Sequence, residues 1–182
     1  QNGLTLEVDE NLDRMGEFTR LYDMTAQRLG FESFYRFDQS YFGAVKKYLP
    51  GYSSLYFVKK EGKTIAAMLM FSYAGKACCH LAASDFNYRE FHMNDLLFAQ
   101  CLNYACGKGL TYICLGGGTS TDKNDSLFRF KKKFGNITLP VYIGKKVIDE
   151  TVYESLVQQW GFRNPALKEK YKHFLQKYRI EG

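Results

Sequence analysis

The sequence predicts a mixed α/β domain, in which a sheet with antiparallel and parallel strands is flanked by helices. Two helical patterns come first, and three strand patterns joined by tight turns follow. A further helical pattern then separates the third strand from a short fourth one. Tight turns join antiparallel strands, whereas a helical crossover makes the next strand parallel. We therefore expect an antiparallel meander, a helix crossover to a parallel strand, and flanking helices, and not a doubly wound sheet.

The first part of the chain predicts two helices that precede the sheet. Within residues 12–29, apolar side chains recur every three or four residues, which predicts an amphipathic helix that Gly30 ends. Asp38 can cap a second helix that runs to about Tyr48. The sequence Leu-Pro-Gly at 49–51 ends it, because proline cannot continue a helix.

The middle of the chain predicts the sheet. Three consecutive strands are expected at residues 55–59, 64–73 and 76–83, with turns at 61–63 and 74–75.

A helix from Asn94 to Cys106 then leads to a short apolar strand at 111–115, parallel to its predecessor. The rest of the chain predicts a helix at 124–134, a strand in 137–147, a helix near 150–160 and a basic helix at 166–179. Because no linker or repeat interrupts the chain, we expect a single domain over residues 1–182, with a core over about 11–160.

The composition limits the class of protein. With 182 residues, of which 46% are hydrophobic, the chain can bury a core. The sequence contains neither an apolar run that would span a membrane nor a signal peptide, so we expect a cytoplasmic protein. Five cysteines without CxxC spacing predict a reducing compartment and no metal site. The net charge of +6 favours an anionic partner such as a nucleotide, CoA or tRNA.

The sequence LGGGTSTDKNDSLFRFKKKFG at residues 115–135 is the strongest indication of a site. Gly116, Gly117 and Gly118 allow backbone to approach a ligand closely, because no Cβ stands in the way. The following helix carries four cationic side chains, so the segment can bind an anion. The alternative is a surface turn followed by a solvated helix face.

Here the chain resembles the GNAT acyltransferase fold, and within it the FemAB-like branch. The motifs are LAAS at 81–84, GLTYICLGGG at 109–118 and SLFRFKKKFG at 126–135. FemAB-like proteins transfer aminoacyl groups from tRNA to amines of peptidoglycan precursors in the cell wall, and their relatives resemble acyl-CoA N-acyltransferases. Such enzymes typically carry two GNAT-like domains and this chain has room for one, so a second such domain or a homodimer is an open alternative.

The resemblance implies roles for particular residues. Lys131 matches the lysine of the family's Phe-Lys pair and would stabilise a tetrahedral intermediate or bind a phosphate; its alternative is a surface lysine. The donor, acyl-CoA or aminoacyl-tRNA, would lie where two strands diverge, and no tightly bound cofactor is expected. The residues expected to bind it are Leu81, Ala82, Ala83, Ser84, Arg89, Asn94, Gly116, Gly117 and Gly118.

The loop 85–92 offers candidates for the amine substrate. Asp85 and Tyr88 lie in it, Phe130 precedes the key lysine, and all three are expected to contact substrate. His92 titrates near neutral pH and is a candidate base, with a solvent-facing histidine as the alternative. This loop lacks the glycine-rich cradle of acetyl-CoA enzymes.

The expected function is therefore N-acyl transfer to an amine, carried by a small molecule or a cell-wall precursor. tRNA is a further potential partner, and DNA is not. The alternative is a non-catalytic half-domain that binds substrate or supports a partner domain.

Overall fold

The structure, a computed structural model, describes residues 3–31 and 33–180. It divides into two compact units, which comprise residues 1–138 and 139–182. The first unit holds the sheet and the helices that cover it. Whether the two units fold as one domain stays a prediction.

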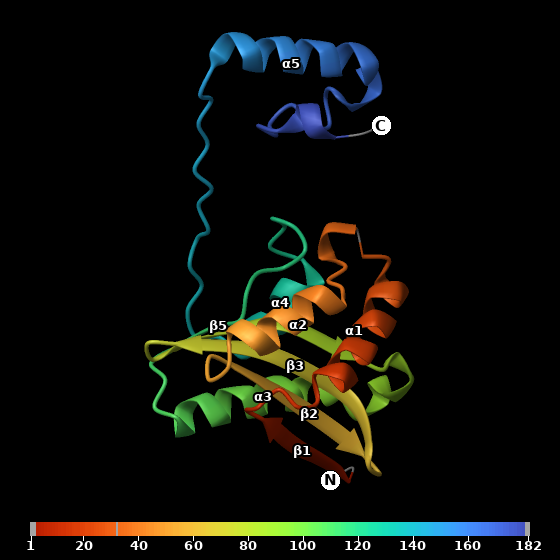
Figure 1. Ribbon diagram of the computed structural model, residues 1–182, viewed down its shortest axis with the longest axis vertical. Helices are drawn as coiled ribbons and strands as arrows, with labels where there is room; N and C mark the ends of the chain where they lie inside the picture. The colour runs from red at the N-terminus through yellow and green to blue at the C-terminus, as the bar shows by residue number, and fades with distance from the viewer. Residues whose placement is uncertain (1–2, 32, 181–182) are drawn as a thin grey trace. The chain divides into compact units, whose positions relative to one another are not determined.

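The first unit contains a five-stranded mixed sheet (Figure 1). The strand order follows the chain, and the strands are β1 (Leu4–Asp9), β2 (Ser53–Lys60), β3 (Lys63–Tyr73), β4 (Lys76–Ser84) and β5 (Tyr112–Cys114). The pairs from β1 to β4 are antiparallel, and β4 and β5 are parallel. The predicted meander and crossover are thus confirmed.

Four α-helices of this unit flank the sheet. They are α1 (Met15–Leu29), α2 (Gln39–Tyr48), α3 (Met93–Gly107) and α4 (Ser126–Lys132). Helices α1 and α2 cover one face and α3 covers the other (Figure 1). The two predicted signals at the helix ends are confirmed. Asp38 accepts a hydrogen bond of 3.0 Å from the Tyr41 N–H, and Gly30 ends α1 with a left-handed φ of 61°.

Each face of the sheet has its own hydrophobic core. Phe18, Tyr22 and Phe42 of α1 and α2 pack on one face, and Leu97 and Phe98 of α3 pack on the other. Strands β2 and β3 lie between these layers and are buried on both faces, which explains their nearly continuous apolar sequence.

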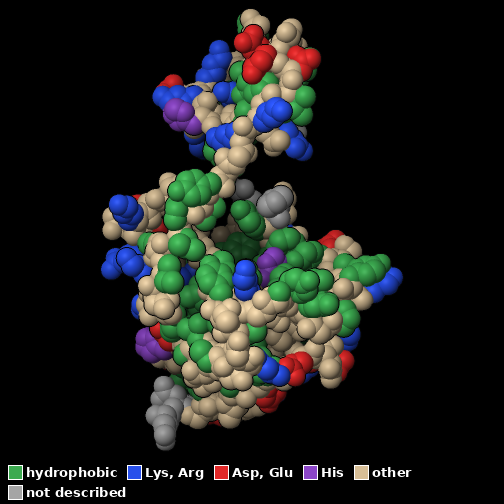
Figure 2. Space-filling view, turned by 90° about the vertical axis from the view of Figure 1, so that its left-hand side faces the viewer, with side chains coloured by type: hydrophobic (Ala, Val, Ile, Leu, Met, Phe, Trp, Pro, Cys, Tyr) green, Lys and Arg blue, Asp and Glu red, His purple; other side chains and the backbone are tan. Residues whose placement is uncertain are grey.

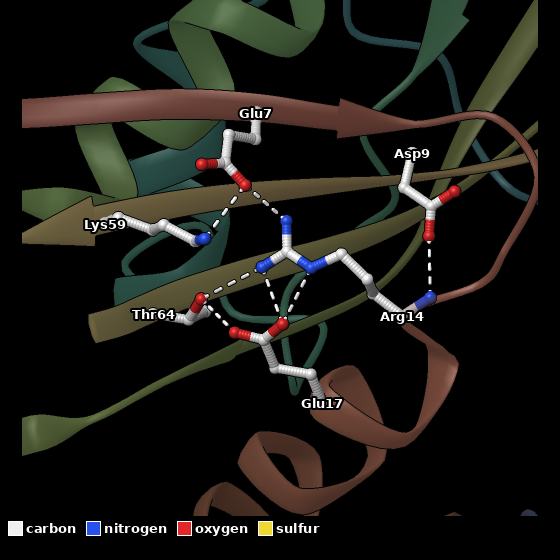
Figure 3. A network of polar contacts seen from close by, with 6 residues as sticks. All are labelled: Glu7, Asp9, Arg14, Glu17, Lys59 and Thr64. Atoms are coloured by element: carbon white, nitrogen blue, oxygen red, sulfur yellow. Dashed lines mark hydrogen bonds and ion pairs between the residues drawn. The ribbon is translucent and has the colours of Figure 1, made fainter. Parts of the chain in front are cut away.

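A polar network ties α1 to the edge of the sheet (Figure 3). The guanidinium of Arg14 lies 2.5 Å from the carboxylates of both Glu7 and Glu17, and it stacks 3.9 Å from the ring centroid of Phe57. Lys59 pairs with the same Glu7 at 2.9 Å. The carboxylates of Glu7 and Glu17 thus each have a cationic partner within the fold. We call this network the structural joint between α1 and the sheet.

One strand of the sheet is absent from the prediction. Strand β1 precedes both helices and pairs with β2 over its whole length, so the expectation that two helices come before the sheet is wrong. The strand has the alternating sequence LTLEVD, and its apolar residues Leu4 and Leu6 pack against the core under α3. That alternation was the signal that could have found it.

Two predicted elements in the second half of the chain are also wrong. No strand forms in residues 137–147, because β-forming side chains make a strand only when another strand accepts their hydrogen bonds. The basic helix at 166–179 is replaced by turns and two short 3-10 segments, Pro165–Leu167 and Lys177–Arg179. Lysines at positions 168 and 172 would repel each other on a helix, and a short helix without a packed face is marginal.

The second unit contains the predicted helix near 150–160, which is α5 (Glu150–Arg163). Asp149 caps it, and the indole N–H of Trp160 donates to the carbonyl of Ile180 at 2.8 Å.

In the described part of the chain, none of the helices has the length and apolar character needed to cross a membrane. Across the same residues, no three histidine, cysteine or acidic side chains gather in a way that could hold a metal ion.

Candidate functional site

The candidate site begins where β4 and β5 diverge. The two strands pair at only three positions, and the last pair joins Cys78 to Cys114. Beyond it, β4 continues to Ser84 and remains paired with β3 alone. The other edge of residues 79–83 therefore has no strand partner among the described residues. Backbone groups along such an edge can bind an extended ligand.

Lys131 of α4 reaches this opening. Its ammonium donates a hydrogen bond of 2.9 Å to the carbonyl of Gly117, in the loop that follows β5. The side chain is partly buried, and the charge acts on the thiols of Cys78, Cys79 and Cys114. Burial lowers the pKa of Lys131 from the ordinary lysine value.

Helix α4 is fixed by apolar contacts on its other side. Phe130 and Phe134 pack on Phe98 of α3, with ring centroids 5.2 and 5.5 Å apart. Lys133 pairs with Asp95 at 2.7 Å. These contacts hold the helix against α3 while Lys131 extends toward the opening. They also give Phe130 a packing role, and its contact with substrate stays a prediction.

The three consecutive glycines differ in what a Cβ atom would meet at each position. Gly116 has a φ of +74°, and a Cβ at this position would lie 3.2 Å from the Lys131 ammonium nitrogen. A Cβ on Gly118 would overlap the carboxylate of Asp125, whereas Gly117 faces open space. The first glycine therefore makes room for the lysine, and the third makes room for a helix cap.

Asp125 organises the loop in front of α4. Its carboxylate accepts hydrogen bonds from the backbone of Thr119, Ser120 and Phe128, and hydroxyl groups of the loop add two more. The hydrogen bond from the Thr119 hydroxyl, together with those from the backbone, lowers the pKa of Asp125 to about 2. Asp125 therefore caps α4, and its carboxylate is ionised at neutral pH.

The predicted donor-binding residues of β4 lie along the open edge. Leu81 and Ala83 turn their side chains into the core under α1, and Ala82 is exposed. At the end of the strand, the backbone N–H of Ser84 donates to the Thr25 hydroxyl at 3.0 Å. Helix α1 therefore closes the edge at Ser84, and the open stretch ends before it.

The loop after β4 folds into a compact segment. It forms a 3-10 helix, Phe86–Phe91, and α3 then begins at Met93, slightly earlier than predicted. Asn94 is thus inside α3, where its side chain donates to the Ser84 hydroxyl at 3.5 Å. Arg89 lies 4.5 Å from the ring centroid of Phe86 and donates to its carbonyl. Both predicted donor ligands thus have partners within the loop and β4.

Asp85 and Tyr88, expected at the substrate, are joined to the sheet. The buried carboxylate of Asp85 lies 3.0 Å from the Lys63 ammonium, which also reaches the Tyr88 hydroxyl at 3.4 Å. Burial opposes ionisation of Asp85, but the hydrogen bonds from Lys63 and Asn87 outweigh it and lower its pKa. These contacts give Asp85 and Tyr88 structural partners.

The two histidines of this region differ. The candidate base His92 links the 3-10 segment to α3 with a left-handed φ of 49°, and its exposed side chain has no capping hydrogen bond. His80, which the sequence places inside a strand, lies next to the opening and is hydrogen-bonded to Tyr41 of α2 at 2.5 Å. No local sequence pattern predicts this pair, because the partners are 39 residues apart.

The surface of the molecule is hollowed on the side that Figure 2 presents. Hydrophobic side chains line the hollow, and histidine and basic side chains lie at its margin (Figure 2).

A separate cavity of about 650 Å³ lies in the second unit, lined by residues of α5 and the end of the chain. None of the predicted site residues lines that cavity.

Comparisons with known proteins place this geometry in context. Residues 1–132 match the family described as Acetyltransferase (GNAT) domain. No curated protein matches the chain.

Several solved structures resemble the fold. An aminoglycoside acetyltransferase from an uncultured soil metagenomic sample, solved with sisomicin, has a TM-score of 0.59 and 16% identity, and the match covers 81% of this chain and 98% of that one. Ribosomal-protein-alanine N-acetyltransferase from Brucella melitensis biovar Abortus 2308 has a TM-score of 0.58 and 10% identity, with 79% and 99% covered. Ard1 from Thermoplasma volcanium has a TM-score of 0.53 and 21% identity, with 73% and 82% covered.

Proposed function

Because the chain belongs to the GNAT acetyltransferase family, we propose that it transfers an acyl group from an activated donor, acetyl-CoA in the first instance, to a primary amine. The observation that carries the proposal is the Lys131 ammonium, which extends into the opening between β4 and β5 and has one carbonyl as its hydrogen-bond partner. The carboxylate of Asp125 acts on this charge from a distance but forms no ion pair with it, because loop backbone groups engage it. A half-buried cation without an ion pair favours a ligand that brings or develops negative charge.

The open edge of β4 supports an extended donor. The arm of CoA that carries the thioester contains two amide groups, which can pair with strand backbone as an added strand does. Residues 79–83 offer unpaired backbone groups for such pairing. The thioester carbonyl would then lie near the start of the opening, where Lys131 acts on the thiols of Cys78 and Cys114.

The chemical step is amide formation. The amine nitrogen attacks the acyl carbonyl, a carbon–nitrogen bond forms, and the carbonyl oxygen becomes an oxyanion. The Lys131 ammonium would stabilise this oxyanion by charge and hydrogen bonding. Collapse of the intermediate breaks the carbon–sulfur bond, and the amine proton is finally carried by the released CoA thiol. GNAT acetyltransferases use acetyl-CoA as a substrate and need no tightly bound cofactor for this chemistry.

A second donor, aminoacyl-tRNA, is favoured by the loop after β4. In place of a glycine-rich loop, residues 86–91 form a 3-10 helix with bulky side chains, and Arg89 is engaged with Phe86. Such a segment offers little room for a pyrophosphate. This departure fits the FemAB-like branch, whose donors are aminoacyl-tRNAs and whose acceptors are amines of cell-wall precursors.

The acceptor that we propose is a small molecule with a primary amine. Sisomicin is a suitable first probe, because it carries several amines and is bound by a solved protein of the same fold. An amine on a cell-wall precursor is the alternative that the FemAB-like motifs imply.

A thermal-shift titration with acetyl-CoA tests the donor. A ligand that binds the folded state raises the melting temperature by mass action. We expect saturable stabilisation by acetyl-CoA, less with CoA that lacks the acyl group, and less again in Lys131→Met. Mass spectrometry of a mixture with sisomicin should then detect an acetylated amine.

The matched control is Lys133→Met, because Lys133 lies two residues away at the C-terminal cap of α4 and pairs with Asp95. It should keep the full response to acetyl-CoA. The absence of any shift with acetyl-CoA, together with salt-sensitive binding of tRNA, would replace the CoA donor by an aminoacyl-tRNA. Binding of neither donor would leave the non-catalytic half-domain as the function.

A further inference from the structure

Strand β4 has a bulge beside the opening. Leu69 of β3 faces Leu81, and the next residue, Met70, faces Cys79, so His80 has no partner on β3. A bulge leaves one residue unpaired, bends the strand and re-aims its side chains. His80 lies two positions beyond Cys78, the last residue of β4 that pairs with β5. The bulge therefore stands at the point where the two strands diverge.

Aromatic side chains hold the His80 imidazole in one orientation. The ring stacks on Phe71 with centroids 4.6 Å apart and an interplanar angle of 26°. The Tyr41 hydroxyl lies 2.5 Å from Nε2, and Tyr41 is itself stacked on Phe37 at 4.3 Å. Contacts from β3 and from α2 thus fix both the plane of the ring and the atom that faces Tyr41.

The other ring nitrogen is not sealed from solvent. Among the described residues, Ser53 Oγ is the one side-chain nitrogen or oxygen that is sealed from solvent and has no partner. His80 is partly buried, and its Nδ1 has no hydrogen-bond partner among these residues. This nitrogen is therefore reachable from outside, on a ring that is otherwise packed.

The surroundings of the imidazole keep it neutral. Tyr41 and Phe37 face it from the α2 side and Phe71 from β3, and the thiols of Cys78 and Cys79 are its neighbours on β4. Burial lowers the pKa of His80 from the ordinary histidine value. At pH 7 the ring is thus unprotonated on one nitrogen, which a base requires.

The other titratable groups near the opening are less suited to this task. The carboxylate of Asp125 is saturated by hydrogen bonds, and that of Asp85 is paired with Lys63. The exposed side chain of His92 lacks a capping hydrogen bond that would orient it. His80 is oriented, and it presents a free nitrogen.

From this geometry we infer that His80 is the catalytic base, which takes the amine proton at Nδ1, and that Tyr41 is a positioning residue, which holds the ring through Nε2. The inference rests on the proposed function. The proton sits on Nε2 in the reactive tautomer and is donated to the Tyr41 oxygen, so Nδ1 keeps its lone pair for a substrate proton. When the amine forms its bond to the acyl carbon, its proton moves to Nδ1 and the ring becomes an imidazolium. The imidazolium then gives this proton to the departing thiolate.

Nuclear magnetic resonance of the intact chain with ¹⁵N-labelled histidine tests the tautomer without any acceptor. The His80 signals are assigned by their loss in His80→Gln. With acetyl-CoA as the added probe, we expect a neutral ring at pH 7 that carries its proton on Nε2, and a weaker tautomer preference in Tyr41→Phe. A ring protonated on Nδ1, whether neutral or charged at pH 7, would overturn the inference, because that nitrogen could not accept a proton.

Transfer kinetics with sisomicin as the amine provide the second test. His80→Gln should lower kcat by roughly 100- to 10,000-fold and leave the KM for acetyl-CoA unchanged. It should also abolish the fall in rate at acidic pH that protonation of His80 causes in the wild type. Tyr41→Phe should lower kcat by a smaller factor and shift that acidic limb. A His80→Gln variant that keeps both the rate and the acidic limb overturns the inference.

Two matched variants control for general effects. His173→Gln changes an exposed histidine of the second unit, and Tyr48→Phe changes an exposed tyrosine of the same helix as Tyr41. Both should behave as the wild type. If the wild type acetylates no amine, the proposed function is at fault, and His80 is then judged by its tautomer alone.

Discussion

Two cationic side chains, Arg14 and Lys131, each link a helical segment to the sheet, but their partners differ. Arg14 meets two carboxylates and a hydroxyl group (Figure 3). It also stacks on the ring of Phe57. Lys131 meets one backbone carbonyl and pairs with no carboxylate of the described residues. The first charge forms ion pairs within the fold, whereas the second forms none among the described residues, as our proposal of a ligand-binding lysine requires. The difference separates a structural joint from a site, although both cations are only partly exposed.

The largest effect should come from removing the unpaired charge. We expect Lys131→Met to lower kcat by about 100- to 1,000-fold, as the loss of one oxyanion donor does in other enzymes. Folding should be affected little, because methionine keeps the aliphatic stem and no carboxylate loses a partner. Steady-state acetyl transfer and a melting curve check both parts. A variant that loses stability and activity together would place Lys131 with Arg14, as part of the framework.

The structural joint should respond in the opposite way. Arg14→Met leaves the carboxylates of Glu7 and Glu17 without their guanidinium, and we expect a loss of about 1–3 kcal/mol in the free energy of unfolding. Urea denaturation measures it. The control is Lys46→Met, since Lys46 forms an exposed pair with Asp13 at 3.5 Å and such pairs contribute little. A normal stability with a reduced kcat would contradict the comparison.

The glycine that accommodates Lys131 should show a smaller, mixed effect. In Gly116→Ala, the positive φ costs about 1–2 kcal/mol. The new Cβ also displaces the ammonium, so kcat should fall as well.

Gly30→Ala is the matched variant, because it has a φ of +61° and open space around its Cβ. It should show the same loss of stability with a normal kcat. Equal kinetics in the two variants would show that the position of the ammonium does not depend on Gly116.

The smallest expected effect is a pH dependence of stability. The hydrogen bond from Lys59, helped by Arg14, lowers the pKa of Glu7. Burial raises the pKa of Glu17, but hydrogen bonds from Thr64 and Arg14 outweigh it, so its pKa is also lowered. This stabilisation is complete above the unfolded value of about 4.3 and is lost as the pH falls through the folded values.

Urea midpoints at pH 7 and pH 3 measure this loss. The midpoint should fall more in the wild type than in Arg14→Met, which has already lost part of the stabilisation. An equal fall in both proteins would mean that Arg14 is not responsible for the lowered pKa values.

The features that sequence predicted well are local ones. The Asp38 cap, the Gly30 stop and the two-residue turn Glu61–Gly62 depend on a few neighbouring residues, and all three are present. The absent strand in 137–147 has suitable side chains, but sheet pairing depends on a distant partner that local sequence does not show.

The candidate site shows the same difference between features that local sequence encodes and features that depend on tertiary packing. The segment 115–135 could be identified because three glycines and four cations lie close together in the sequence. Lys131 is singled out within it by its match to the lysine of the family's Phe-Lys pair. The approach of Tyr41 to His80 depends on how α2 packs against β4, and no local pattern encodes it. The same holds for Asp85 and Tyr88, whose chemistry suggested a substrate but whose partner, Lys63, comes from β3.

The short pairing of β5 has a consequence for motion. This strand is held to the sheet at three register positions, and the loop and helix that carry Lys131 follow directly after it. So short a pairing stabilises β5 weakly, and we expect it to separate from the sheet by local opening more readily than the longer strands do. We expect the amide protons of β5 to exchange with solvent sooner than those of β2 and β3, which are buried on both faces.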